Sequence, residues 1–170
     1  MLKKIATAAV VIVGLCGGSG WRSVHAAEGA PTLTPQDYIE IQQLYSRYVR
    51  AADMGGAGDG SDWADCFTPD GEFGNAKGPD ALKKIIKNFH VNTLQKNGWS
   101  SRHTYSGLLI TPTTEGAKGS VYALVFNVTA KPPFVDHSGV YEDWLVKTAA
   151  GWKFKKRLFK QNGSFQPSLP

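Results

Sequence analysis

The second half of the chain constrains the fold most, because it contains four successive segments with the composition of β-strands. These segments cover residues 102–111, 119–130, 140–148 and 152–159. Val, Tyr and Phe are frequent in them, and each joint between them contains Gly or Pro. Segments joined this closely pair as hairpins, so the sequence predicts an antiparallel sheet here.

The first half predicts helices. Thr34 can cap a helix that begins at Pro35, and Asp37 favours the positive end of that helix. Asp53 ends it before a glycine-rich run at 55–60. The apolar stripe of this helix repeats at steps of three and four residues. Its members are Tyr38, Ile41, Tyr45, Tyr48 and Ala52.

Two further helices and a short strand are expected before the sheet. A brief helix covers residues 62–67, and a longer one follows Gly78-Pro79 and ends near Asn97. Between them, Pro69-Asp70-Gly71 predicts a turn and residues 72–74 predict a strand. His90 is expected at the boundary of the apolar face of the longer helix.

Helices followed by hairpin-like strands predict an α+β domain. The 170 residues suit one domain, and a 42% hydrophobic content with five Trp and eight Phe provides a core. We expect a curved antiparallel sheet wrapped over the first long helix. Such a cone-shaped α+β barrel has an apolar pocket at its open end.

The N-terminus has the pattern of an export signal. Lys3 and Lys4 precede an apolar run, and Val24-His25-Ala26 matches a cleavage site, so residues 1–26 are predicted to be removed. The alternative is lipidation at Cys16, which Leu15 disfavours. Residues 27–34 then form a tether, 35–162 the domain and 163–170 a tail. The protein is expected in the periplasm or secreted.

Cleavage changes what the composition implies. It leaves sixteen basic against fourteen acidic residues, a net charge of +2, so the basic character of the full chain does not indicate nucleic-acid binding. Cys66 becomes the only cysteine, which excludes an internal disulfide and a zinc site built on cysteines. The spacing of Asp59, Asp62 and Asp65 does not match a calcium loop.

Three residues are the candidates for proton transfer. His103 begins the first long strand and is suited to act as a general base, although a structural histidine is the alternative. Asp53 lies at a helix C-terminus, where the dipole disfavours a carboxylate, so it is either solvated or paired with a donor such as His103. Tyr48 is expected to be buried with its hydroxyl either paired or facing the pocket.

Other polar residues have weaker signals. His137 is expected in a loop at the pocket rim. Lys153, Lys155 and Arg157 alternate with aromatic residues and predict one solvated face of an edge-like strand, with an anion contact from Arg157 as the alternative. Phosphate-loop, dinucleotide and nucleophile-elbow motifs are not present in the sequence.

Several short pieces, in their order and spacing, resemble the SnoaL-like branch of the nuclear transport factor 2-like superfamily. The resemblance covers about residues 35–160. The pieces are Ile41–Tyr48, Ala52-Asp53, Trp63–Phe67, Asp70–Phe73, Gly78 with Ala81-Leu82, Arg102-His103, Gly139–Asp143 and Gly151–Phe154.

The resemblance implies a cone with a pocket, chemistry without a cofactor or metal, and a homo-oligomer, either a dimer or a trimer. Relatives such as scytalone dehydratase, bile-acid 7α-dehydratase and hexachlorocyclohexane dehydrochlorinase use a His–Asp dyad, which matches His103 and Asp53. The bile-acid enzyme has a tyrosine that matches Tyr48. A further polar position falls near Asn127. Lys147 stands nearest to an arginine of the dehydrochlorinase.

The expected function is a cofactor-independent lyase that acts on a small hydrophobic cyclic or aromatic compound. An isomerase or cyclase with the same dyad, or a non-catalytic binding protein, is the alternative. No nucleic acid and no stable membrane anchor are expected as partners. Candidate substrate-binding residues are Tyr45, Trp63, Phe67, Trp99, Tyr122, Phe126, Asn127, His137, Tyr141, Lys147 and Arg157.

Overall fold

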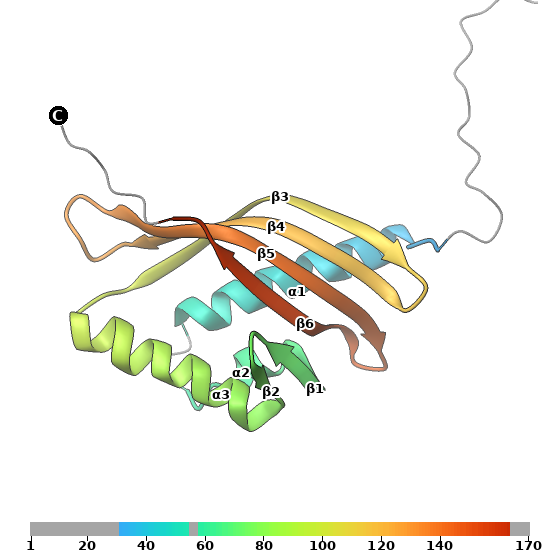
Figure 1. Ribbon diagram of the computed structural model, residues 1–170, viewed down its shortest axis with the longest axis horizontal. Coiled ribbons are helices and arrows are strands. Elements are labelled where there is room, and N and C mark those ends of the chain that lie inside the picture. Colours follow the sequence, from blue (N-terminus) through green and yellow to red (C-terminus); the bar gives the residue numbers. More distant parts are fainter. Residues whose placement is uncertain (1–30, 55–57, 164–170) are drawn as a thin grey trace, which may run out of the picture. The chain divides into compact units, whose positions relative to one another are not determined.

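The computed structural model describes residues 31–54 and 58–163, which contain helices followed by a sheet (Figure 1). The helical elements are α1 (Pro35–Met54), α2 (Ser61–Ala64), α3 (Pro79–Asn88), the π-helix η2 (Phe89–Leu94) and the 3₁₀-helix η3 (Gln95–Asn97). The strands are β1 (Phe67–Phe73), β2 (Ala76–Lys77), β3 (Ser101–Thr113), β4 (Gly116–Asn127), β5 (Phe134–Thr148) and β6 (Gly151–Gln161). This arrangement confirms the α+β class. The predicted signal peptide and most of the tail lie outside the described residues.

The six strands form one curved sheet in the order β2-β1-β6-β5-β4-β3. Strands β3 to β6 pair antiparallel as consecutive hairpins, as predicted. Strand β1 pairs parallel with β6, so the sheet is mixed rather than purely antiparallel. The parallel pair also places β6 inside the sheet, and the prediction of an edge-like strand there was wrong.

Residues 69–71, predicted as a turn, lie within β1, where the register shifts.

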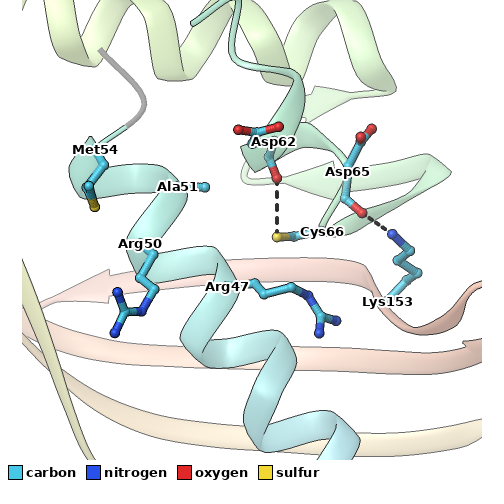
Figure 2. A pocket seen from close by; sticks show the side chains of 8 residues that line it. All are labelled: Arg47, Arg50, Ala51, Met54, Asp62, Asp65, Cys66 and Lys153. Carbon is cyan, nitrogen blue, oxygen red and sulfur yellow. Dashed lines mark hydrogen bonds between the residues drawn. The ribbon is translucent and has the colours of Figure 1, made fainter. Parts of the chain in front are cut away.

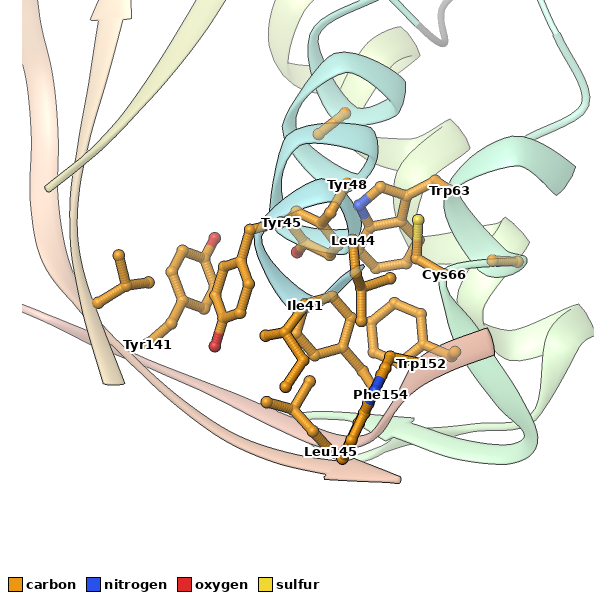
Figure 3. Packing of buried hydrophobic residues seen from close by; sticks show 14 of the residues in the cluster. Ile41, Leu44, Tyr45, Tyr48, Trp63, Cys66, Tyr141, Leu145, Trp152 and Phe154 are labelled. Carbon is orange, nitrogen blue, oxygen red and sulfur yellow. The ribbon is translucent and has the colours of Figure 1, made fainter. Parts of the chain in front are cut away.

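Helix α1 crosses the inner face of the sheet and provides one side of the core (Figure 3). Its buried apolar positions are Ile41, Leu44, Tyr45, Tyr48 and Ala52. They pack against Leu145 of β5 and against Trp152 and Phe154 of β6. Burying such side chains stabilises the domain by about 1.5–3 kcal/mol each. No helix of residues 31–54 and 58–163 is long and apolar enough to cross a membrane.

A β-bulge in β6 decides which side chains enter this core. Leu145 pairs with Phe154 and Trp144 pairs with Lys156, so Lys155 is an extra residue without a partner. An extra residue reverses the alternation of side chains that follow it. Arg157 therefore points to the same face as Phe154 and is fully buried. The predicted solvated face of Lys153, Lys155 and Arg157 was wrong for Arg157.

The first turn of α1 is fixed to the sheet through Asp37. Its carboxylate accepts hydrogen bonds from the Thr34 backbone N–H and hydroxyl, from Lys147 Nζ at 2.8 Å and from Trp152 Nε1 at 2.9 Å. The bond from Lys147 is the largest of the effects that lower the pKa of Asp37 far below its usual value. The carboxylate thus joins the helix start to β5 and β6.

The low pKa of Asp37 predicts a pH-dependent contribution to stability. Asp37→Asn should lower the melting temperature at pH 7, because the ionised carboxylate is stabilised only in the folded state. Since the folded pKa is depressed, this contribution is present above the unfolded value of about 4 and is lost as the pH falls below it. Thermal melts from pH 7 to pH 3 should show the difference shrinking. A constant difference would contradict the assignment.

Candidate functional site

The structure brings His103 and Asp53 together, although fifty positions separate them in the chain. Asp53 lies in the last turn of α1, and His103 lies on the inner face of β3. His103 Nδ1 is 2.6 Å from Asp53 Oδ1, and the two side chains are only 8% and 7% exposed. The His103 backbone N–H and the Ser101 hydroxyl also donate to this carboxylate, at 2.8 and 3.0 Å. These donors compensate the unfavourable position of a carboxylate at a helix C-terminus.

This geometry determines the tautomer of His103. Because Nδ1 faces the carboxylate, it carries the hydrogen and donates it, and the lone pair is left on Nε2. The carboxylate also stabilises the imidazolium that forms when Nε2 accepts a proton. The pair therefore has the arrangement of a buried general base.

His90 is a second imidazole near this pair. The sequence predicted it only at the boundary of an apolar helix face, but it is buried in η2. Burial lowers its pKa, while a hydrogen bond to the Ala52 backbone and the charge of Asp53 act in the opposite direction. Its Nε2 has no hydrogen-bond partner among the described residues. His90 is thus a neutral imidazole with a free ring nitrogen beside the dyad.

A small cavity lies next to Ser101, at the end of the sheet where His103 is found. Its volume is about 30 Å³, which is the space of roughly one water molecule. Eleven residues line it: Phe89, Thr93, Leu94, Trp99, Ser100, Ser101, Val125, Phe126, Asn127, Asp136 and His137. Four predicted substrate-binding residues are therefore here: Trp99, Phe126, Asn127 and His137. The Oδ1 atom of Asn127 accepts hydrogen bonds from the Thr129 and Ala130 backbones and so also shapes the following turn.

Arg157 lies deeper, inside a cage of aromatic rings. Its guanidinium carbon is 3.9 Å from the Tyr141 ring centre, 4.1 Å from Tyr48 and 4.4 Å from Phe154. Its Nε is 3.3 Å from Asp143 Oδ1, and Tyr45 donates a 2.5 Å hydrogen bond to the other oxygen of Asp143. A fully buried charge of this kind is stabilised by cation–π contacts and by its carboxylate partner.

Tyr48 belongs to this cage and is separated from the dyad. Its ring packs against Trp63, Phe67 and Tyr141, and within the described residues no ring contact joins it to His103. Burial raises the pKa of Tyr48 well above its usual value, so its hydroxyl stays protonated. Four predicted substrate-binding residues are likewise buried core residues: Tyr45, Trp63, Phe67 and Tyr141.

Two predicted binding residues lie elsewhere. Tyr122 points to the outer face of the sheet and is 63% exposed, so its assignment to the pocket was wrong. Lys147 bonds Asp37 at the opposite end of α1 from Asp53. Sixteen residues of helix separate the two aspartates, about 24 Å, and Lys147 therefore cannot act on a ligand held by the dyad.

A larger hollow of about 520 Å³ lies on the other side of α1, between that helix, α2 and β6 (Figure 2). Arg47, Arg50 and Lys153 line it together with Asp62, Asp65, Cys66, Ala51 and Met54. Burial raises the pKa of the Cys66 thiol to about 11, so it is not a reactive thiolate at neutral pH. Neither His103 nor Asp53 lines this hollow, whereas Ser101, which donates to Asp53, lines the smaller cavity.

A helix over a curved mixed sheet, with a buried His–Asp pair at one end, defines an α+β cone of the cystatin-like class. Residues 34–158 match the SnoaL-like domain, and the chain belongs to that family. The family includes polyketide cyclases and dehydratases.

Solved structures agree with this assignment. Rv3472 from Mycobacterium tuberculosis, described as a protein of unknown function, is 27% identical, with a TM-score of 0.63 over 79% of this chain and 78% of its own. A protein from Catenulispora acidiphila in complex with S-DNPA is also 27% identical, with a TM-score of 0.64 over 75% and 95%. An NTF2-like protein with a cystatin-like fold from Novosphingobium aromaticivorans is 23% identical, with a TM-score of 0.64 over 76% and 85%. None of the curated proteins matches the chain.

Proposed function

We propose that the protein is a cofactor-independent lyase that eliminates water, or a small fragment in a retro-aldol reaction, from a small hydrophobic cyclic or aromatic compound. The observation that carries the proposal is the buried pair of His103 and Asp53, in which Nε2 of His103 has no hydrogen-bond partner among residues 31–54 and 58–163. The complex of a similar protein with S-DNPA supports a small-molecule ligand.

Each group has a distinct role in this proposal. For the loss of water, His103 Nε2 removes a proton from a carbon next to a carbonyl group; for the retro-aldol cleavage, it removes the proton of the β-hydroxyl group. Asp53 holds the imidazole and stabilises its charged form. Arg157 lies behind Tyr105 and is paired with Asp143, so it has a structural role in the core. Tyr48 has a structural role as part of the Arg157 cage.

A ring-sized ligand needs more room than about 30 Å³. Phe89 and Trp99 cover the cavity from η2 and from the segment after η3, where π- and 3₁₀-geometry replace the regular helix. Ligand entry therefore requires these two side chains to move. Interrupted helices of this kind are common at functional sites.

A mass-spectrometric screen tests the proposal. The protein is incubated with aromatic and alicyclic β-hydroxy ketones, and we expect at least one product that has lost one water or one small fragment. A product of unchanged mass and new retention time would favour the isomerase or cyclase alternative, which uses the same dyad. Binding without any product would favour a binding protein.

We also propose that the mature protein is exported and forms a homo-oligomer through the outer face of the sheet. Leu109, Tyr122 and Leu124 are exposed there on β3 and β4. Exposed apolar side chains gathered on one face are typical of an interface.

Tyr122→Lys should therefore reduce the solution mass to that of one chain, because it introduces a charge into the buried centre of the interface. Light scattering coupled to size-exclusion chromatography measures this. Ile39→Lys, at an exposed apolar position of α1, is the matched control and should leave the mass unchanged. A wild-type monomer would contradict the proposal.

A further inference from the structure

We infer that His137, held by Asp136, is a second proton-transfer group that lies in the same row of the sheet as His103 and protonates the leaving oxygen. This inference rests on the proposed function of His103 and extends it. A hydroxyl group leaves poorly unless it receives a proton, so an elimination of water needs an acid as well as a base.

The register of the sheet places the two histidines in one row. His103 on β3 is directly opposite Val125 on β4, and Val125 is directly opposite His137 on β5. Directly opposite residues point to the same face of a sheet, and adjacent strands lie about 4.8 Å apart. The two histidine backbones are therefore about 10 Å apart. Val125 and His137 both line the cavity, so a ring bound over Val125 lies between the imidazoles.

A second β-bulge gives His137 its carboxylate partner. Val125 pairs with His137 and Phe126 pairs with Val135, so Asp136 is an extra residue in β5. Neighbouring residues of a regular strand point to opposite faces, but both residues of this bulge line the cavity. His137 Nδ1 is 2.7 Å from Asp136 Oδ2. Nδ1 therefore donates to the carboxylate, and Nε2 is available to a ligand, as it is in His103.

The two pairs differ in their access to water, and this difference assigns their roles. The side chains of His103 and Asp53 are 8% and 7% exposed, whereas those of His137 and Asp136 are 24% and 30% exposed. The buried pair suits the removal of a proton from carbon, because a base that is poorly solvated by water is more reactive. The more exposed pair can exchange protons with solvent after each turnover.

In a β-hydroxy ketone, the C–H bond next to the carbonyl breaks, and its proton moves to His103 Nε2. The electron pair forms a C=C bond as the C–O bond of the β-hydroxyl breaks. The departing oxygen takes the Nε2 proton of a protonated His137 and leaves as water. His103 then releases its proton and His137 regains one from solvent.

Two probes separate the acid from the base. The first, 5-nitro-1,2-benzisoxazole, opens when a base removes its ring C–H proton, and its nitrophenolate product leaves without a proton. The second, 4-hydroxy-4-phenylbutan-2-one, must lose a hydroxyl group, and its conjugated product is followed by absorbance. We expect wild-type turnover of both, and loss of both in His103→Gln. His137→Gln should lower kcat for the ketone about 100-fold or more and change the benzisoxazole rate less than about threefold.

Two further variants serve as controls. Asp136→Asn should lower the ketone kcat about tenfold with the same difference between probes, because Asp136 only positions His137. Ser138→Ala, which alters the next residue of β5, should leave both rates unchanged.

The outcomes distinguish the acid role of His137 from the base role of His103. If His137→Gln retains ketone turnover, or loses both activities equally, the acid role is overturned while the dyad stands. If benzisoxazole turnover persists in His103→Gln, or wild type converts neither probe, the proposed function fails and this inference fails with it.

Discussion

His103→Ala is expected to reduce turnover by about 10²–10⁴-fold, because it removes the only atom of the dyad that can accept a proton from substrate. Asp53 remains bound by the Ser101 hydroxyl and by the backbone N–H of residue 103, so the end of α1 stays attached to β3. Steady-state kinetics on a compound found by the screen measure the loss. Equilibrium dialysis of the same compound should show that binding survives.

His103→Gln is the matched control for the space left by the alanine. Glutamine keeps most of the volume and can still donate to Asp53, but it cannot act as a base. Both variants should therefore be equally inactive and equally folded by circular dichroism. Full activity in either variant would remove the dyad from the mechanism and leave a ligand-binding role.

Asp143→Leu should destabilise the fold by about 3–5 kcal/mol, because it leaves the fully buried Arg157 without its carboxylate. Burial raises the pKa of Asp143, and the nearby Arg157 and the Tyr45 hydrogen bond oppose that effect. Tyr45 also loses its acceptor in this variant. Urea denaturation of the purified variant measures the change in the free energy of unfolding.

The double variant Asp143→Leu with Arg157→Met, compared with the two single variants Asp143→Leu and Arg157→Met, tests the same pair. Methionine fills the aromatic cage without a charge, so the double variant should be more stable than Asp143→Leu alone. Additive losses from the two single variants would contradict a direct interaction between the two charges. The cycle thus measures the coupling rather than the cost of one substitution.

Most of the secondary structure followed from the sequence. The stripe of α1 and the turn signals between strands predicted α1, β3, β4, β5 and β6, and most of these elements form close to the expected bounds. Strand β5 begins at Phe134 rather than at residue 140, so the prediction of a loop at His137 was wrong. These signals are local, since helix periodicity and turn chemistry depend on residues near in sequence. The parallel pairing of β1 with β6 joins segments about ninety residues apart, and no local pattern indicates it.

Side-chain direction was predicted less well, for two physical reasons. Lys155 and Asp136 are bulge residues, and an extra residue reverses the alternation that strand predictions assume. The buried position of Arg157 was missed for this reason. In β4 the whole run from Val121 to Phe126 is apolar, so its inner and outer faces could not be told apart, and Tyr122 was assigned to the wrong one.

The pairing of His103 with Asp53 could be anticipated because a carboxylate at a helix C-terminus needs a donor. The sequence could not predict the volume of the cavity near the pair. Whether aromatic side chains line a hollow or fill it depends on their packing, which no single-chain pattern encodes. Tyr48, Trp63 and Phe67 fill the interior, and a small cavity remains near Trp99.

The two aspartates at the ends of α1 restrict the movement of that helix. Asp37 bonds the start of the helix to β5 and β6, and Asp53 bonds its end to β3. Because both ends are bonded to the sheet, α1 cannot move away from it without breaking the hydrogen bonds of one carboxylate. The proposed ligand is then expected to enter along residues 89–99, where the backbone departs from regular helical geometry.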